Sequence, residues 1–259
     1  MAKSNNRLYH IGFGRDDLGE EAPIAALLSG DPERSRYIAQ NYLHDARTLS
    51  AHRSLNSYLG RLPNKRPILS ATSGMGASSL SIVVNELVQV GIRQIIRVGT
   101  CGSIQEYIRV GSIVISSAAL CRQGAANDIA PVEYPAAASP FLTVALVNAA
   151  RELKIEHYLG ITASVDTFYE GQERTEGVPY LLRHLRGITE EYRQLNILNY
   201  EMECGTLFKM AGVYNFTAAC VCAVVAQRTV GENIALEMKD VAIENAIRVA
   251  IRAAESFDS

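Results

Sequence analysis

The chain has 259 residues, of which 48% are hydrophobic and 20% are charged, and its formal net charge is −2. This length and composition fit one globular α/β domain spanning 1–259, since no internal repeat, low-complexity tract or linker divides the sequence. The near-neutral charge excludes a global attraction to nucleic acid or to an anionic membrane, although basic side chains can still gather around a small anion.

The first half of the chain alternates predicted strands and helices. An apolar run at 24–28 is expected to be a strand that turns into a helix at 29–34. Strand 67–72 leads into the glycine-rich turn 73–76, and apolar residues spaced i, i+3, i+4 then predict a helix that ends at Gly91. Two further strands are expected at 94–98 and 112–116, followed by a helix near 141–153.

The second half continues this alternation. Strands are predicted at 160–165, 196–200 and 217–225, with a polar loop at 166–177 and a helix at 203–211. The last helix, about 237–257, is expected to turn Val241, Ile247, Ala250 and Ile251 inward. This alternation predicts a largely parallel or mixed sheet that is covered on both faces and binds ligands at the carboxyl ends of its strands.

The sequence predicts a protein of the reducing cytoplasm. Its longest apolar run, 218–226, is too short to span a bilayer and is interpreted as a buried strand. The first residues contain no apolar stretch followed by a small-residue cleavage site, so export is not expected. The five cysteines are odd in number and their spacing fits neither a zinc site nor a disulfide framework, so Cys220 and Cys222 are expected to be buried thiols.

Several basic positions predict an anion site. Gly30 lies in a strand-to-helix turn and Arg34 follows one helical turn later, although Gly-Asp-Pro is also a common turn without a ligand. Arg97 interrupts an apolar strand, where a guanidinium needs an anion or a carboxylate beside it. Thr100 and the glycine-flanked amides around it would complete a phosphate or carboxylate site. The alternative is a structural ion pair between Arg97 and an acid such as Glu86.

The segment 166–174 places an aromatic ring, a carboxamide and a guanidinium in one loop after a strand. Phe168 would stack on a flat heterocycle. Gln172 and Arg174 complement an imide such as uracil, which offers two carbonyls and one N–H. The alternative is a solvated loop that buries its phenylalanine.

The acidic motif at 200–203 lies where an apolar strand ends. A carboxylate there would accept hydrogen bonds from vicinal hydroxyls such as those of ribose; the alternative is a helix N-terminus stabilised by acids. The chain has no Walker loop, complete GxGxxG fingerprint, HExxH or CxxC motif, and its five histidines lack metal-ligand spacing. Neither a metal nor a nicotinamide cofactor is therefore expected.

These residues converge on a known family. The stretch TSGMGASSLSIVVNEL at 72–87 resembles the signature of the purine nucleoside and uridine phosphorylases, and the similarity runs from Leu8 to the terminal helix. Within that family, DTFYEGQER at 166–174 and RHLRGITEE at 183–191, with NYEME at 199–203, resemble the uridine-cleaving branch. The resemblance implies a three-layer α/β/α fold with a mixed, partly barrel-like sheet. It also implies a homohexamer, a trimer of dimers, whose subunits share their sites.

The resemblance implies a role for each candidate residue. The phosphate-binding positions are Gly30, Arg34, Arg97 and Thr100, together with Arg53, which is lent to a neighbouring subunit. The base-binding positions are Phe168, Gln172, Arg174 and Arg228. The ribose-binding positions are Met202, Glu203 and His10, the last of which reaches a neighbour's ribose. Arg97, Gln172, Arg174 and Glu203 are the residues expected to carry the catalysis.

Some positions depart from the family's pattern without removing a group that the chemistry requires. Ser78 stands where Pro or Ala is preferred, and Ser54 replaces an acid that often helps to hold an interface cation. Cys101 stands in place of Thr, Glu170 in place of Pro, and Ala226–Gln227 in place of Val-Asn.

The implied reaction is that of a pentosyltransferase of pyrimidine salvage: uridine and inorganic phosphate give uracil and ribose 1-phosphate, with no cofactor. Cleavage of deoxyuridine or thymidine stays open. A purine nucleoside phosphorylase is the rival, but that branch uses a late Asp where this chain has Val-Ala-Gln-Arg at 225–228. A catalytically silent nucleoside-binding homologue is the other alternative. The joint presence of Arg34, Arg97, Gln172, Arg174 and Glu203 argues against it.

Overall fold

The computed structural model describes residues 6–177, 179–229 and 236–257. Its strands are β1 (Ala25–Ser29), β2 (His44–Ser50), β3 (Ser57–Arg61), β4 (Pro67–Thr72), β5 (Gln94–Ser103), β6 (Ile113–Arg122), β7 (His157–Val165), β8 (Ile197–Glu201) and β9 (Thr217–Gln227). Its α-helices are α1 (Pro32–Tyr42), α2 (Ala77–Gln89), α3 (Gly124–Ile129), α4 (Pro140–Glu152), α5 (Ile188–Gln194), α6 (Cys204–Tyr214) and α7 (Leu236–Ser256). Short 3-10 helices lie at Arg15–Leu18, His52–Ser54, Glu170–Gln172 and Arg183–Leu185.

The strands form one mixed sheet that closes partly into a barrel. Their order is β2-β3-β4-β1-β5-β8-β7-β6-β9, and β9 also pairs with β5, which closes a ring of five strands. β5 is parallel to β1 and β9, whereas β8 runs antiparallel to β5 and β6 runs antiparallel to β9. The sheet therefore confirms the expected mixed, partly barrel-like architecture.

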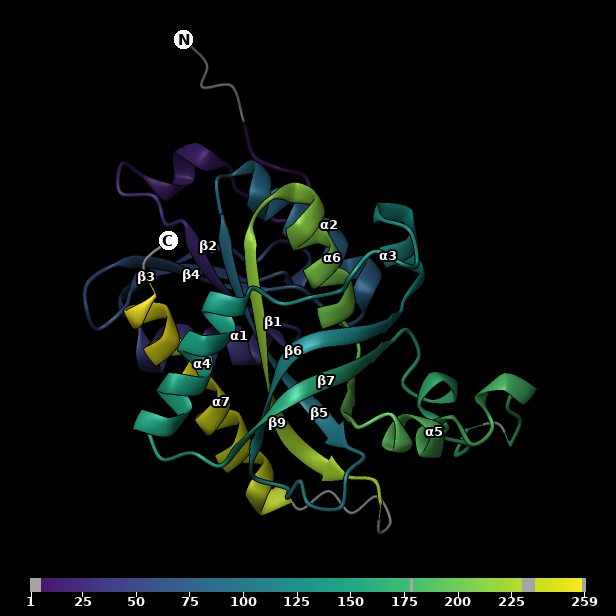
Figure 1. Cartoon of the computed structure of the whole chain (residues 1–259). Coiled ribbons are helices and arrows are strands. Elements are labelled where there is room, and N and C mark those ends of the chain that lie inside the picture. The colour runs from purple at the N-terminus through teal and green to yellow at the C-terminus, as the bar shows by residue number, and fades with distance from the viewer. Residues whose placement is uncertain (1–5, 178, 230–235, 258–259) are drawn as a thin grey trace.

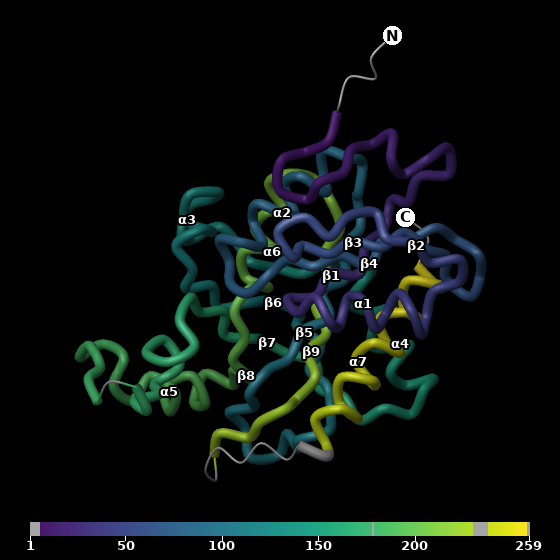
Figure 2. The backbone as a smooth tube through the Cα atoms, turned by 180° about the vertical axis from the view of Figure 1, so that it is seen from behind, coloured from purple at the N-terminus to yellow at the C-terminus, as the bar shows by residue number. Residues whose placement is uncertain are grey.

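Helices cover the sheet on both sides, as the three-layer prediction requires (Figure 1). α1, α4 and α7 pack on one side around a buried cluster that includes Leu146 and Ile247. α2, α3 and α6 pack on the other side, around a cluster that includes Leu80 and Phe208. The view from behind places the edge strand β2 and its neighbour β3 on one side of the molecule and α5 on the other (Figure 2).

Local signals fix where the helices begin. Asp31 caps α1 by accepting a hydrogen bond from the Glu33 N–H at 2.9 Å, and Pro32 supplies the first helical residue. Ser139 and Pro140 start α4 in the same way. Because Asp31 directly follows the turn after β1, this capping holds the start of α1 against the end of the strand.

The predicted strands and helices are confirmed, with differences at their ends. The sequence predicts that β5 ends at Val98, but the strand continues through Gly99–Gly102 to Ser103, so the glycine-flanked amides lie inside a strand paired with β9. The inward stripe on α7 is confirmed for Ile247, Ala250 and Ile251 but wrong for Val241, which is 48% exposed. The neighbouring Ala242 is fully buried instead, because the apolar stripe of α7 runs through it.

Two further expectations from the sequence concern the cysteines and membrane-spanning segments. All five cysteines are free, and Cys220 and Cys222 are fully buried on β9, as expected. Among the described residues, no helix combines the length and the apolar character that crossing a bilayer requires.

Candidate active site

A cavity of about 280 Å³ opens where β1, β7 and β8 end, beside the second half of β5. The cavity thus lies at strand ends, where the sequence predicts that a ligand binds. The cavity is lined by Gly30, Asp31, Arg34, Met75, Arg97, Thr100, Cys101, Gly102, Phe168, Gln172, Arg174, Tyr200, Glu201, Met202, Glu203, Val225 and Ala226. The structure thus brings together most of the predicted site residues, from segments more than 100 residues apart.

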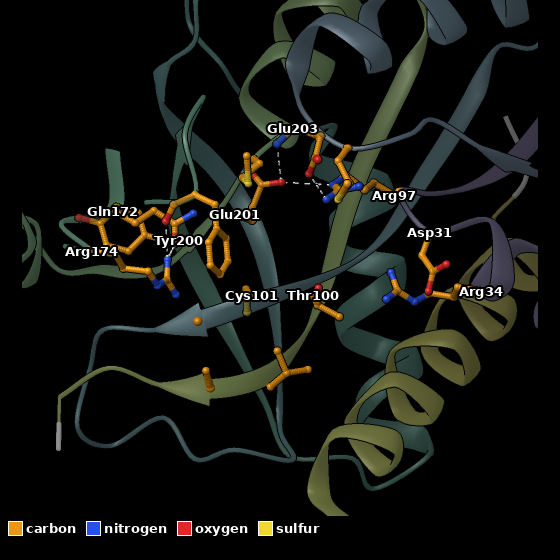
Figure 3. A pocket seen from close by; sticks show the side chains of 17 residues that line it. Asp31, Arg34, Arg97, Thr100, Cys101, Gln172, Arg174, Tyr200, Glu201 and Glu203 are labelled. Atoms are coloured by element: carbon orange, nitrogen blue, oxygen red, sulfur yellow. Dashed lines mark hydrogen bonds and ion pairs between the residues drawn. The ribbon is translucent and has the colours of Figure 1, made fainter. Parts of the chain in front are cut away.

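The cavity has two chemically different ends (Figure 3). Arg34 and Arg97 lie at one end, and Gln172 and Arg174 lie at the other. Glu203 stands beside Arg97, and Cys101 lies between the two ends. A ligand that fills the cavity must therefore carry an anion at one end and a polar, flat group at the other.

Arg97 is the centre of the first end. It is 4% exposed; its Nε donates to Glu201 Oε2 at 3.2 Å, and its Nη2 donates to Glu203. Burial alone would lower the pKa of the Arg97 guanidinium, but Glu203 and Glu201 raise it well above its ordinary value. Arg97 is therefore held as a cation. The alternative of a structural ion pair is therefore confirmed, but Glu86 is the wrong acid, because strand order places β8, not α2, beside this arginine.

Two buried donor atoms at this end lack protein partners. Arg97 Nη1 and Arg34 Nε are buried, and neither has a hydrogen-bond partner among the described residues. Arg34 Nη1 donates to the Val98 carbonyl at 3.2 Å, which holds this side chain beside β5. Burial lowers the pKa of Arg34, an effect that Asp31 opposes and the charge of Arg97 reinforces. Because unpaired buried donors are costly, this end favours an oxyanion.

Gly30 keeps the space beside these donors open. A Cβ at this position would lie 3.2 Å from the Gly74 carbonyl oxygen and 4.0 Å from Arg97 Nη1. A side chain would therefore crowd the turn after β4 and approach the unpartnered nitrogen. Thr100, on β5, also lines this part of the cavity.

Glu203 connects the anion end to the middle of the cavity. Its carboxylate accepts a hydrogen bond from the Gly76 N–H at 2.6 Å as well as from Arg97. Burial raises the pKa of Glu203, and the charge of Arg97 opposes this shift. Met202 is fixed beside it by Gln123, whose Nε2 donates to the Met202 carbonyl at 2.6 Å.

Glu201 is a buried carboxylate for which the sequence predicted no role. It accepts hydrogen bonds from Arg97 Nε, the Glu203 N–H at 2.8 Å, the Cys204 N–H and the Ser164 hydroxyl. It thereby orients Arg97 and the start of α6 together. The sequence did contain a signal for such an acid: Arg97 lies inside the apolar strand β5, and a buried arginine requires a buried carboxylate nearby.

The second end of the cavity is built by the loop after β7. Gln172 is 3% exposed and Arg174 is 6% exposed. Arg174 Nη1 donates to Gln172 Oε1 and, at 2.8 Å, to the Phe168 carbonyl. The guanidinium lies 3.9 Å from the centre of the Phe168 ring. Phe168 is about half exposed, so the alternative of a solvated loop with a buried phenylalanine is wrong.

Arg228 lies behind this end and does not line the cavity. Its Nη2 donates to the Gln172 carbonyl, and its guanidinium lies 5.2 Å from the centre of the Tyr200 ring. Tyr200 lines the cavity wall, which the sequence did not predict. Arg228 thus contacts the second end of the cavity from outside, through Gln172 and Tyr200.

His10 and Arg53 also lie outside the cavity lining, close to one another on the surface. His10 Nδ1 lies 2.6 Å from Glu86 Oε1, and Arg53 Nη2 donates to the Tyr9 hydroxyl at 2.9 Å. The Tyr9 and His10 rings meet edge to face. Burial alone would raise the pKa of Glu86, but the Ile11 N–H and His10 lower it below its ordinary value.

Comparison with known proteins shows similarity to phosphorylases over nearly the whole chain. The sequence pattern of the phosphorylase superfamily matches residues 24–257. A uridine phosphorylase of Haemophilus influenzae is 38% identical over 96% of this chain and 98% of its own length. A uridine phosphorylase of Escherichia coli is 36% identical over 98% of both chains. A DeoD-type purine nucleoside phosphorylase of a Thermoanaerobacter species is 31% identical over 95% of this chain and 99% of its own.

The contacts of Glu201 generate a stability prediction. Replacing Glu201 by Gln leaves Arg97 with one carboxylate instead of two and places an amide among donors, so we expect a loss of about 3–5 kcal/mol in the free energy of unfolding. Urea denaturation of the variant measures this loss. Glu106→Gln is the matched control, because Glu106 pairs with Arg193 at the surface and should contribute less than about 1 kcal/mol. Equal losses in the two variants would contradict the role assigned to Glu201.

Proposed function

The chain belongs to the phosphorylase superfamily, and from its site we propose that it cleaves uridine with inorganic phosphate to give uracil and ribose 1-phosphate. The observation that carries this proposal is the pair of buried, unpartnered guanidinium nitrogens of Arg97 and Arg34, with an amide and a guanidinium at the far end of the same cavity. The full-length similarity to uridine phosphorylases supports the choice of nucleoside.

Phosphate binds at the first end in this proposal. Arg97 Nη1 and Arg34 Nε donate to its oxygens, the Thr100 hydroxyl adds a polar contact, and Gly30 leaves room for the anion. Phosphate therefore supplies the acceptor oxygens that these two donor nitrogens do not find among the described residues. Since both donors are held by the sheet, the nucleophile is positioned before the reaction begins.

Ribose occupies the middle of the cavity. Its vicinal hydroxyls are donors, and the Glu203 carboxylate, which in the ligand-free chain accepts from Arg97 and the Gly76 N–H, is the acceptor they meet. Met202 lines the same wall and packs on the sugar. Fixing the sugar between phosphate and base places C1′ in line for substitution.

Uracil lies against Gln172 and Arg174, which line the same end of the cavity. In the reaction the bond between C1′ and the base nitrogen breaks, its electron pair leaves with uracil, and a phosphate oxygen forms the new bond to C1′. Arg174 and Gln172 donate hydrogen bonds to the negative charge that develops on the base. Phosphate is itself the nucleophile, so no covalent intermediate with the protein is required. Inorganic phosphate is the co-substrate, and the reaction uses no cofactor.

Two residues act in trans in this proposal. His10 and Arg53 are expected at the ribose and phosphate of another subunit, and in this chain they lie outside the cavity, near Tyr9 at the surface. We therefore propose a homohexamer, a trimer of dimers, whose dimers complete each other's sites. The same proposal places the enzyme in the cytoplasm, in the salvage of pyrimidines.

A purine nucleoside is the second candidate, and a relative of this chain carries that name. The purine branch is expected to use a late Asp at the base, but β9 ends here in Val225, Ala226 and Gln227. Ala226 lines the cavity and offers no acidic group. Uridine therefore remains the proposed substrate.

Incubation with uridine, thymidine, inosine and methylthioadenosine, with and without phosphate, tests this function. Release of uracil that depends on phosphate is the expected result, and chromatography of the free base measures it. Release of a purine base, or cleavage of uridine without phosphate, would overturn the proposal.

Arg174→Ala tests the stabilisation of the leaving base. Loss of a donor to developing charge costs about 2.7–4 kcal/mol of barrier, so we expect kcat for uridine to fall about 100-fold or more. Arg183→Ala removes an exposed arginine from the same segment of the chain and should leave kcat unchanged. An unchanged rate in Arg174→Ala would remove this residue from the site.

Coexpression of two deficient variants tests the sharing of sites. Arg53→Ala and Arg174→Ala are each expected to lose most activity, but a mixed dimer contains one site with both arginines intact. Random pairing should therefore restore about a quarter of the sites. Activity no higher than the mean of the two variants would show that Arg53 does not act in trans.

A further inference from the structure

Four cysteine thiols lie together in and beside the wall of the five-stranded barrel. Cys220 and Cys222 follow one another on the same face of β9, with their sulfur atoms 3.6 Å apart. Cys204 begins α6, and its sulfur lies 3.2 Å from the Ser164 hydroxyl. Cys101 lies on β5 and lines the cavity described above. The proposed phosphorolysis uses none of these thiols.

A carboxylate completes this cluster. A carboxylate oxygen of Glu201 and the sulfur atoms of Cys204 and Cys220 all lie within 4.8 Å of one another. All three residues are buried. In a tetrahedral site with metal–sulfur bonds of about 2.3 Å, two sulfur ligands are separated by roughly 3.8 Å. The three ligand atoms therefore need to approach by only about 1 Å to surround one ion.

The geometry points to a site for one soft, thiophilic cation, such as Cd²⁺ or Zn²⁺, held by Cys204, Cys220 and Glu201 beneath the cavity floor. Thiolates select such cations over Mg²⁺ or Ca²⁺. On binding, each thiol releases its proton to solvent as its sulfur–metal bond forms. The Glu201 oxygen that now accepts from Ser164 exchanges this hydrogen bond for the cation.

A chain of adjoining thiols links the cavity to this site. Cys101 is buried but lines the cavity, and burial together with the neighbouring thiol of Cys222 raises the pKa of Cys101. Cys222 in turn contacts Cys220. The ligand set is therefore in contact, through thiols, with a residue of the cavity lining.

Binding of a cation at this site is expected to change the charged groups that line the cavity. Glu201 also accepts from Arg97 Nε and from the Glu203 N–H, so a cation that draws on this carboxylate changes the charge and position of both groups. We expect bound cation to inhibit phosphorolysis. This consequence rests on the proposed function, whereas the binding site does not.

Titration of the full chain with Cd²⁺ tests the site. The expected result is an ultraviolet sulfur-to-metal charge-transfer band that saturates at one ion per chain, with a higher melting temperature because the ion binds the folded protein. Cys204→Ser and Cys220→Ser should each weaken binding by more than about tenfold. Cys121→Ser is the matched control, since Cys121 is a free thiol outside the ligand set, and it should bind as the parent does.

Several outcomes would overturn the proposal. A band that persists unchanged in Cys204→Ser and Cys220→Ser, or one that is lost equally in Cys121→Ser, contradicts the ligand set. A melting temperature that falls with Cd²⁺ shows binding to unfolded thiols instead. Uridine cleavage measured in the same samples should fall as the band grows; a saturated band with full activity contradicts the coupling through Glu201. Absence of cleavage before Cd²⁺ is added would count against the proposed function alone.

Discussion

The burial of one guanidinium organises this molecule. Arg97 sits inside the central strand β5 and is 4% exposed, in a place where an uncompensated charge would not be tolerated. Glu201 and Glu203 compensate it from the end of β8 and the start of α6, yet within the part of the chain that the structure describes one guanidinium nitrogen has no partner. The two carboxylates therefore neutralise the buried charge of Arg97 in the folded chain, while Nη1 of the same side chain can still donate to a ligand.

This balance depends on the closed part of the sheet. β8 reaches β5 only because the ring of five strands curls back on itself, and the contact between the two strands is confined to the pairs at Gly102 and Ser103. That short pairing brings the two carboxylates to Arg97, and α6 then packs on the sheet against β6 and β9. Closure of the barrel thus places Glu201 and Glu203, from the second half of the chain, against Arg97 from the first half.

Some of this arrangement is evident in the sequence, and some of it is not. The strands β4, β5 and β9 and the helices α2 and α7 follow from apolar periodicity, because each is buried along a continuous stripe or face. The edge strand β2 is almost wholly exposed, so its polar sequence gives no such signal. The position of Arg97 in an apolar strand indicates a buried anion or acid beside it, but which residue supplies that acid depends on the order of the strands. Glu86 is therefore a reasonable choice from the sequence alone, and Glu201, 104 residues away, is the correct one.

The two ends of the cavity are stabilised in different ways, and this difference has a functional meaning. The anion end is fixed by strands and buried charges, so a change there disturbs the core. The base end rests on a loop that Glu173 closes locally, through hydrogen bonds to the Gly187 and Thr189 N–H groups. Substitutions in that loop can alter which base is held without breaking the sheet. Preference for a base can therefore change on this scaffold while the chemistry at the anion end stays the same.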